Sequence, residues 1–489
     1  MSNESHKPRR DPAEHRFYLT TTLPYVNAKP HLGFAWEVVT ADIITRYHRL
    51  LGETAFFNTG TDEHGQKIYQ KAQELGMSPQ EYVDQMSAHF ANLKTSLELS
   101  YTHFARTTNA HHVAAAQEFW RRCEKAGDIY KKKYQTKYCV GCELEKTDSE
   151  LVDGHCPLHP HQELEIREED NYFFRLSKYQ EKLLDFYARH PDFVQPVGRM
   201  KELLAFVKAG LQDFSISRLA NKMPWGIPVP GDESQVMYVW FDALVNYIST
   251  LDWPDEDSDA DYFWPGVQLC GKDNLRQQAA MWQAMLMSAG VANSRQILVN
   301  GFITVDGQKM SKSLGNVISP DALVETYGTE ATRFLIAGFP VLGEDVDITA
   351  ARLHDFYTAH LTNGLGNLAS RLAKLASTVE TGWELEMPKA LSPEIRQPLD
   401  NYRVHEALQT IIDHVARLDG RLSGEKPWLL PDGVDRKRVL TPILNDFLQL
   451  VFDLRLFMPQ TSQKIAGHFH PHQIMPLPPL FPRLKLETK

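Results

Sequence analysis

The sequence predicts an α/β protein in which a parallel sheet, interrupted by an insertion, is followed by an α-helical bundle. Short β-branched and aromatic runs alternate with helical patterns in residues 16–127 and again in residues 221–318. Between these segments, residues 128–220 break the alternation and carry cysteines, histidines and a basic run. Beyond residue 319, apolar residues recur three and four positions apart, which is the helical spacing.

Size and composition describe an ordinary globular chain of 489 residues, with 43% hydrophobic and 23% charged residues. The net charge of -10 excludes a generally basic nucleic-acid-binding protein, so any such surface must be a local patch, and residues 131–137 form the dense basic run. Five cysteines in this length do not form a disulfide framework. The polar N-terminus and the lack of a long apolar run predict a cytoplasmic protein without a secretory signal or membrane span.

The first half of the predicted sheet lies in residues 16–127, after an extension (residues 1–15) that we expect to be disordered. Residues 17–21 predict a strand, and His31 opens a helical pattern that runs to about residue 51. Residues 54–59 predict a second strand, which ends in the polar segment 60–65 and is followed by about 50 helical residues. The helix start at His31 favours a phosphate, because its amides are unpaired and Gly33 lets a ligand approach the backbone.

The second half of the predicted sheet uses the strand-like runs 235–240, 267–270 and 296–300. The last run leads into a loop, residues 306–316, that carries two lysines and two serines between glycines. Ammonium and hydroxyl donors on a flexible loop suit a polyphosphate, although a solvated surface loop is the alternative. A lone histidine at a helix start is often only a cap. Because both features follow strands of one sheet, we expect them to meet at its carboxyl edge.

Two short pairs of potential metal ligands lie in the insertion. Cys139 and Cys142 are separated by thirteen residues from Cys156 and His159, which is close to the spacing of structural zinc sites. The alternative is four unrelated residues, but three of the five cysteines fall within eighteen positions. The sequence therefore predicts one structural zinc ion, with the histidines at 155 and 161 competing for the fourth position.

The last third of the chain is predicted to be helical. Residues 319–360 form a linking segment and residues 361–489 form the bundle. Two amphipathic patterns carry this prediction, and they consist of Val404, Leu408, Ile411, Val415 and Leu418, followed by Leu440, Ile443, Phe447, Val451, Leu454 and Met458.

Taken together, these motifs resemble the methionyl-tRNA synthetases, a family of class I aminoacyl-tRNA synthetases. Residues 309–313 spell the Lys-Met-Ser-Lys-Ser loop and residues 31–34 resemble the helix signature of that class. The segments 22–27, 60–65, 238–243 and 271–273 match in order and spacing, so the resemblance covers about residues 16–485. It implies a class I Rossmann-like catalytic domain with a single zinc knuckle in its insertion, and an anticodon-binding bundle. Because the sequence ends soon after the bundle, without the appended domain that dimerises some family members, we expect a monomer.

The resemblance implies ATP-dependent activation of L-methionine to methionyl-adenylate and transfer to initiator and elongator tRNA-Met, with Mg²⁺ accompanying ATP. Lys312, Lys309 and His31 would be the catalytic residues, the lysines stabilising charge on the leaving diphosphate. The implied ATP site also contains Gly33, Phe34, Gly271, Asp273, Ile303, Met310, Ser311 and Ser313.

The resemblance also implies a methionine pocket and an anticodon site. Apolar and aromatic side chains suit a thioether, and a carboxylate can pair with the substrate ammonium. The pocket residues would be Leu23, Tyr25, Asp62, Trp240, Ala243, Tyr247 and Gln278. Without their neighbours, Trp240 and Tyr247 would be assigned to the core. The anticodon would be read by Asn367, Arg371 and Trp428.

Two positions depart from the family pattern. Phe34 stands where a second histidine or another polar residue is usual, and Gln278 stands where a histidine is common. These departures keep open a synthetase paralogue with another amino acid or acceptor. A non-catalytic RNA- and zinc-binding relic is a further alternative, against which the intact lysine loop and Asp62 argue.

Overall fold

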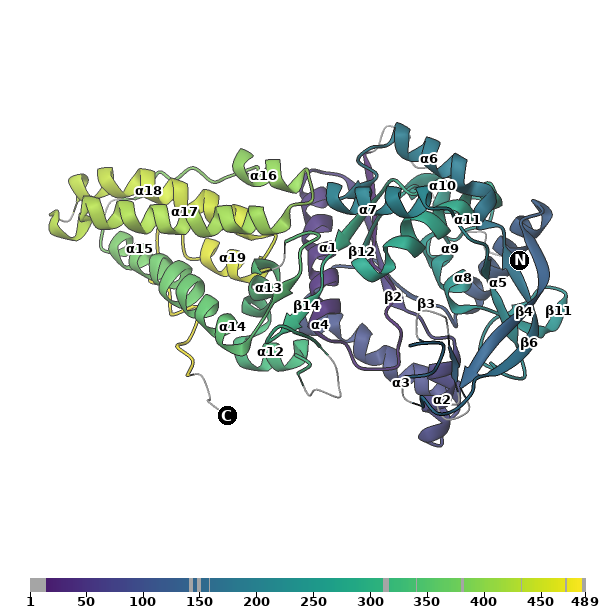
Figure 1. The fold of residues 1–489 in the computed structure, drawn as a ribbon. Helices are drawn as coiled ribbons and strands as arrows, with labels where there is room; N and C mark the ends of the chain where they lie inside the picture. Colours follow the sequence, from purple (N-terminus) through teal and green to yellow (C-terminus); the bar gives the residue numbers. More distant parts are fainter. Residues whose placement is uncertain are drawn as a thin grey trace, which may run out of the picture.

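The computed structural model describes residues 15–139, 144–146, 151–157, 159–310, 316–339, 341–379, 382–431, 433–470 and 473–485. An α/β part and a part made of long helices lie end to end, so that the molecule is elongated (Figure 1). Within these ranges no helix has the length and apolar character needed to cross a membrane.

A six-stranded parallel sheet forms the centre of the α/β part. Its order reverses between β1 and β12. On one side β2 and β3 follow β1 outward, and on the other β13 follows β12, with the earlier strand β7 added at the edge. In open α/β sheets, ligands bind beyond the carboxyl ends of the strands at such a reversal. The strands are, in spatial order, β3 (His103–Arg106), β2 (Thr54–Thr61), β1 (Arg16–Thr20), β12 (Val267–Gly271), β13 (Gln296–Asn300) and β7 (Val194–Gln195).

Each face of this sheet packs against a separate core. The two cores divide the side chains of β1 between them: Phe17 and Leu19 belong to one cluster, and Tyr18 to the other. This alternation is the two-residue period of a strand buried on both faces. The first cluster includes α1 (Leu32–Leu50) and continues into the bundle, and the second includes α5 (Ala110–Lys125) and α11 (Trp282–Ala289).

The structure confirms four of the predicted strands, at β1, β2, β12 and β13, and the helix that begins after His31. The predicted helical run after β2 contains helices, but it also contains β3, an edge strand of four residues that is too short for a clear pattern. The helices there are α2 (Gln66–Glu74), α3 (Pro79–Ala91), α4 (Leu93–Ser96) and α5. Likewise β7 lies within residues 128–220, yet its two residues join the edge of the main sheet.

The expectation that residues 235–240 extend the parallel sheet is wrong. β11 (Asp232–Met237) instead pairs antiparallel with β9 (Ser217–Leu219) and β10 (Pro228–Val229) in a separate sheet. The reason is local, because Gly231 adopts a φ of 78° and turns the chain back into a hairpin between β10 and β11. The residues that follow form the helix α8 (Val239–Leu244).

An antiparallel ribbon dominates the insertion. β4 (Ile129–Cys139) pairs with β6 (Glu165–Phe174) over ten residue pairs, with β5 (Leu144–Lys146) and β8 (Phe214–Ser215) at the edges. The basic run of the sequence lies on β4, directly opposite Glu168, Glu169 and Asp170 on β6. Its charge is therefore partly offset by the neighbouring strand. The insertion also contains η2 (Leu176–Tyr179), α6 (Gln180–Arg189) and α7 (Val197–Lys208).

The bundle confirms the two predicted amphipathic helices as α17 (Val404–Glu425) and α18 (Val434–Leu454), which lie side by side (Figure 1). A short strand, β16 (Val346–Asp347), pairs with β14 (Ile303–Val305) in the segment where we predicted helix alone. The remaining elements are α9 (Asn246–Ser249), α10 (Ala260–Phe263), η3 (Lys272–Asn274), η4 (Gln277–Met281), β15 (Gln308–Lys309), α12 (Pro320–Tyr327), α13 (Thr329–Gly338), α14 (Ala350–Phe356), η5 (Tyr357–Gly366), α15 (Asn367–Ser377), α16 (Pro393–Leu399), η6 (Pro427–Leu429) and α19 (Pro459–Ala466).

Candidate active site

A cleft of about 1230 Å³ opens where the strand order reverses. It brings together all the predicted ATP and methionine residues whose side chains are described: Leu23, Tyr25, His31, Gly33, Phe34, Asp62, Trp240, Ala243, Tyr247, Gly271, Asp273, Gln278, Ile303 and Met310. For Lys309 the structure describes the backbone, in β15. Ser311, Lys312 and Ser313 lie outside the described residues.

The helix start at one side of the cleft is built by His31 and Gly33. His31 is the N-cap of α1, and its Nδ1 accepts a hydrogen bond of 3.0 Å from the Gly33 amide. A Cβ on Gly33 would lie 2.9 Å from the imidazole Cε1, so a side chain at this position would displace the imidazole from the cap. The capping role considered from the sequence is therefore real. It is compatible with a ligand role, because the imidazole is exposed and lines the cleft.

Both described ends of the lysine loop lie at this helix start. The Met310 Cε is 3.8 Å from the position that a Gly33 Cβ would take. After the loop, the Ile318 carbonyl accepts a 2.9 Å hydrogen bond from the Leu32 amide. Before it, Asp306 and Gly307 have φ values of 52° and 71°, which form the tight turn between β14 and β15.

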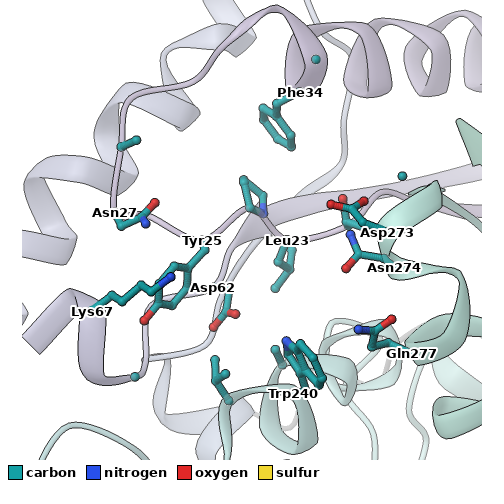
Figure 2. Close-up of a pocket in the computed structure, with 18 of the residues that line it drawn as sticks. Leu23, Tyr25, Asn27, Phe34, Asp62, Lys67, Trp240, Asp273, Asn274 and Gln277 are labelled. Carbon is teal, nitrogen blue, oxygen red and sulfur yellow. The ribbon is translucent and has the colours of Figure 1, made fainter. Parts of the chain in front are cut away.

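Asp62 lies on the other side of the cleft, between Tyr25 and Trp240 (Figure 2). Its side chain is buried, and its Oδ1 has no hydrogen-bond partner in the part of the chain that the structure describes. Burial raises the pKa of Asp62 well above its usual value, and the nearby Asp242 carboxylate raises it further. An unpaired buried carboxylate is costly, so this position is suited to a cationic ligand group.

Tyr25 is held beside Asp62 by close packing. Gly65 has a φ of 114°, and a Cβ there would lie 2.7 Å from the Tyr25 hydroxyl oxygen. Burial raises the pKa of Tyr25, and the negative charge of Asp62 raises it further, so its hydroxyl stays neutral. Leu23 and Trp240 add apolar surface on the side of the carboxylate away from Tyr25 (Figure 2).

The inner end of the cleft is closed by Gln278 and Tyr247, both of which are buried. The Gln278 amide donates to the Tyr247 hydroxyl over 2.5 Å, and its carbonyl oxygen accepts from Gln268 over 3.2 Å. The Tyr247 carbonyl in turn accepts a 2.8 Å hydrogen bond from Tyr18 in β1. Gln278 therefore holds a neutral polar network in place at the position where the family pattern has histidine.

Phe34 contributes no polar atom to the cleft. Its ring packs edge-to-face against Phe90, with 5.4 Å between centroids. One turn further along α1, Glu37 lines the same cleft and was missed by the sequence reasoning. It accepts hydrogen bonds of 2.6 Å from the amide and hydroxyl of Thr22, and burial raises its pKa to about 7. The sequence could have indicated this role, because Glu37 lies four residues after Gly33 and therefore on the same face of the helix.

Three of the four predicted metal ligands meet at the end of the β4–β6 ribbon. The ligand atoms of Cys139, Cys156 and His159 all lie within 4.8 Å of one another, with 3.6 Å between Cys139 Sγ and His159 Nδ1. This set of thiols and an imidazole could hold a metal ion, and it favours His159 over its neighbours at 155 and 161. Cys142 lies outside the described residues.

Two of the three predicted anticodon residues lie together in the bundle. The Arg371 guanidinium is 5.6 Å from the centre of the Trp428 ring and forms an ion pair with Asp419. Asn367 is exposed one helical turn before Arg371 on α15. Trp428 is 41% exposed on η6, which joins α17 and α18, so a planar ligand can reach its indole.

Comparison with known proteins identifies the class of this chain. The family model described as "tRNA synthetases class I (M)" matches residues 17–165 and 159–373. This agrees with the parallel sheet, the cleft at its strand-order reversal and the helix start described above.

Individual relatives identify the family. The chain is 42% identical over 474 residues to a methionine–tRNA ligase of Thermosynechococcus vestitus, covering 92% of this chain and 89% of the relative. It is 45% identical over 361 residues to a chloroplastic/mitochondrial methionine–tRNA ligase of Arabidopsis thaliana, covering 73% of this chain and 58% of that one. The structure of Mycobacterium tuberculosis methionyl-tRNA synthetase in complex with methionyl-adenylate superposes with a TM-score of 0.85, at 33% identity over 95% of this chain and 99% of that one. The chain belongs to the methionyl-tRNA synthetase family.

Proposed function

We propose that this chain ligates methionine to tRNA-Met through methionyl-adenylate, and that the cleft at the strand-order reversal is its active site. The observation that carries this proposal is Asp62, a buried carboxylate with an unpartnered oxygen, in the same cleft as the helix start that favours phosphate. The family membership and the solved relative with bound methionyl-adenylate support it.

In this proposal Asp62 pairs with the ammonium group of methionine. The thioether lies against Leu23, Trp240 and Ala243, which offer apolar contacts to a flexible and polarisable group. Tyr25 lines the part of the pocket that holds the ammonium group, and the hydrogen-bonded pair of Tyr247 and Gln278 closes the inner end of the pocket. Such a pocket favours an uncharged side chain of about the length of methionine, since the neutral side chains of Tyr247 and Gln278 form its inner end.

The activation step needs alignment and charge stabilisation more than covalent chemistry from the protein. The methionine carboxylate attacks the α-phosphorus of ATP in line, a P–O bond forms, and the bond to the leaving diphosphate breaks. His31, Lys309 and Lys312 contact the phosphates in this proposal, and Gly33, Phe34, Gly271, Asp273, Ile303, Met310, Ser311 and Ser313 complete the nucleotide site. Mg²⁺ accompanies ATP as its counter-ion. Because Phe34 offers no donor, the lysine loop and the α1 amides carry the phosphate contacts.

We propose one structural zinc ion held by Cys139, Cys142, Cys156 and His159. The described thiols and imidazole are a donor set that fits Zn²⁺. A closed site of this kind supplies a cross-link between segments of the insertion and takes no part in the reaction.

The helical part is proposed to bind the tRNA anticodon, with residues 319–360 as the link to the catalytic domain and residues 361–489 as the anticodon-binding domain. The Trp428 indole would stack on an unpaired base, and the Arg371 guanidinium and the Asn367 amide would read base edges. Initiator and elongator tRNA-Met both carry the methionine anticodon, so both are proposed substrates.

We propose that the protein is a monomer, and light scattering of the purified protein tests this. The proposed compartment is the cytoplasm, although one relative is named chloroplastic/mitochondrial.

The decisive experiment is ATP–diphosphate exchange with each of the twenty amino acids, followed by charging of both tRNA-Met species. We expect exchange with methionine and charging of both tRNAs. Asp62→Asn should raise the methionine KM, whereas Asp261→Asn, which changes an exposed carboxylate outside the cleft, should leave it unchanged. Exchange with another amino acid would favour the paralogue, and no exchange would favour the non-catalytic relic.

A further inference from the structure

Behind the methionine pocket lies a second buried carboxylate, Asp242. It is fully buried on α8, the helix that also supplies Trp240 and Ala243 to the cleft. Its Oδ2 lies 3.1 Å from Nδ1 of His64, and its Oδ1 has no hydrogen-bond partner among the described residues. Asp242 thus resembles Asp62 in burial and in having one unsatisfied oxygen.

His64 connects the two carboxylates. Its backbone amide lies close enough to the Asp62 carboxylate to lower the pKa of that group, and its buried imidazole faces Asp242. The three side chains therefore form one cluster, which we call the Asp62–His64–Asp242 cluster. It joins the segment after β2 to α8, although the two are separated by about 180 positions of the chain.

The charges within this cluster do not balance. Two carboxylates can carry two negative charges, while one imidazole can carry at most one positive charge. A net negative charge that is buried and unpaired is strongly disfavoured. The empty cluster therefore retains a proton on its carboxylates, in agreement with the raised pKa of both Asp62 and Asp242, which burial causes in each case and which the mutual repulsion increases at Asp62.

We propose that binding of methionine at Asp62 releases a proton from the Asp62–His64–Asp242 cluster. The substrate ammonium brings the positive charge that the cluster lacks, so the retained proton is no longer needed and leaves to solvent. This inference rests on the proposed function, because it takes the α-ammonium group of the amino acid as the ligand of Asp62. It makes methionine affinity depend on pH through three residues, two of which do not contact the substrate.

The other ionisable groups around the cluster do not supply the missing charge. Glu63 is already paired with Arg106 through two hydrogen bonds, of 2.7 and 3.0 Å. His112 bonds to Ser249, and burial lowers its pKa to about 3, so it is neutral. Tyr25 has a neutral hydroxyl, and Lys222 is paired with Glu169 on the ribbon. Lys67 and Arg218 line the cleft, but among the described residues neither forms an ion pair with Asp62 or Asp242; Arg218 instead bonds to Ser215 and Ser217 and lies over the Tyr238 ring. Tyr238 and His111 are the other titratable groups nearby.

Calorimetric titration of the full-length protein with L-methionine tests the proposal. At one pH near 7, the binding enthalpy is measured in phosphate, imidazole and Tris, and its dependence on the buffer ionisation enthalpy gives the number of protons released. We expect release of up to about one proton, and methionine Kd should fall up to about tenfold per pH unit while the cluster is protonated. Because a proton leaves the cluster when methionine binds, methionine affinity increases as pH rises. The increase ends at the pH where the ligand-free cluster has already lost this proton.

Two variants assign the proton to the cluster. Asp242→Asn removes one negative charge, so release near pH 7 should fall by at least half, while Asp261→Asn should match the wild type. His64→Gln removes the one group of the cluster that can carry a positive charge, so the midpoint of the pH dependence should move upward. It serves as the independent test if Asp242→Asn does not fold.

The outcomes separate this inference from the proposed function. If methionine does not bind at all, the proposed function fails. If methionine binds with the same enthalpy in all three buffers, the proton release is refuted and the proposed function stands. If Asp242→Asn releases as many protons as the wild type on binding methionine, the proposal is also overturned. The same holds if His64→Gln leaves the midpoint of the pH dependence unchanged.

Discussion

In the proposed function, Lys312 acts on the phosphates and Asp62 acts on the amino acid. In that role the lysine would contribute most when charge develops on the leaving diphosphate, and therefore in the transition state. The carboxylate contributes when methionine binds. The two roles predict different kinetic signatures.

We expect Lys312→Ala to lower the rate of adenylate formation by about 10²–10³-fold, with little change in methionine affinity. Single-turnover adenylate formation and ATP–diphosphate exchange measure the first effect, and calorimetry measures the second. Lys125→Ala, at an exposed lysine of α5, is the matched control. A normal exchange rate in Lys312→Ala would refute the role of this lysine.

Glu37 predicts a pH dependence of stability. Burial raises its pKa to about 7 in the folded protein, from a model-peptide value of 4.5, so the folded state keeps its proton to higher pH. The free energy of unfolding should therefore fall as pH rises from about 4.5 through 7. Glu37→Gln removes this loss while a side-chain oxygen can still accept the bonds from Thr22. The variant should be more stable than the wild type by about 3 kcal/mol at pH 8, and by much less at pH 5.

Urea unfolding at pH 5 and pH 8 measures both values. If the free energies of unfolding of Glu37→Gln and the wild type differ by the same amount at both pH values, the prediction is contradicted. A change in packing alone would not depend on pH.

At the scale of elements, the β4–β6 ribbon has little core at the end where the metal ligands lie. The residues of the two strands pair with one another over ten positions, but the large buried apolar side chains described for the ribbon lie at the other end, at Ile129, Phe173 and Phe174. A metal cross-link is therefore the main tertiary restraint that we expect for the ligand-bearing end.

We expect about one zinc ion per chain by elemental analysis, as one closed four-ligand site requires. Cys139→Ser should lose most of this zinc and show faster amide exchange at the ligand-bearing end of the ribbon. Cys123→Ser, at a buried cysteine away from the ligand group, should keep its zinc. A wild-type protein without zinc, or a Cys139→Ser protein that retains it, would refute the site.

At the scale of the whole molecule, one buried arginine joins the sheet domain to the bundle. Arg333 on α13 pairs with Asp42 on α1 at 2.8 Å, and both side chains are fully buried. It also donates hydrogen bonds to the carbonyl groups of Leu97 and Phe457, each of 2.9 Å. The two parts of the elongated molecule in Figure 1 thus share a polar contact within a continuous core.

Arg333→Met should destabilise the protein by about 3–5 kcal/mol, because it leaves a buried carboxylate without its partner. Burial would raise the pKa of Asp42, but the charges of Arg333 and Arg46 overcome this and lower it. The Asp42 carboxylate therefore stabilises the folded protein at pH values above its pKa in the unfolded chain. This stabilisation is lost as pH falls through its pKa in the folded protein. Urea unfolding measures the loss, and adding Asp42→Asn to Arg333→Met should recover part of it. If Arg333→Met alone is as stable as the wild type, the prediction is contradicted.

The sequence by itself determined the parts of this protein that are local. The strands β1, β2, β12 and β13 have clear apolar patterns, His31 is followed by helical periodicity, and the spelling of residues 309–313 identifies a loop type. These features depend on residues within a few positions of one another, so a linear pattern contains them. They sufficed to predict the family and a minority of the residues that line the cleft, although every predicted ATP and methionine residue whose side chain is described lies there.

Tertiary structure alone decided the features that depend on distant contacts. β3 and β7 are too short to show a period and are stabilised by pairing with longer strands. Residues 235–237 have the apolar character of a core strand, but the hairpin turn directs them into another sheet. The partnership of His64 with Asp242 joins residues 178 positions apart, and it arises because α8 packs behind the segment that carries Asp62. Burial creates the charge imbalance there, and burial is a property of the fold and not of any stretch of sequence.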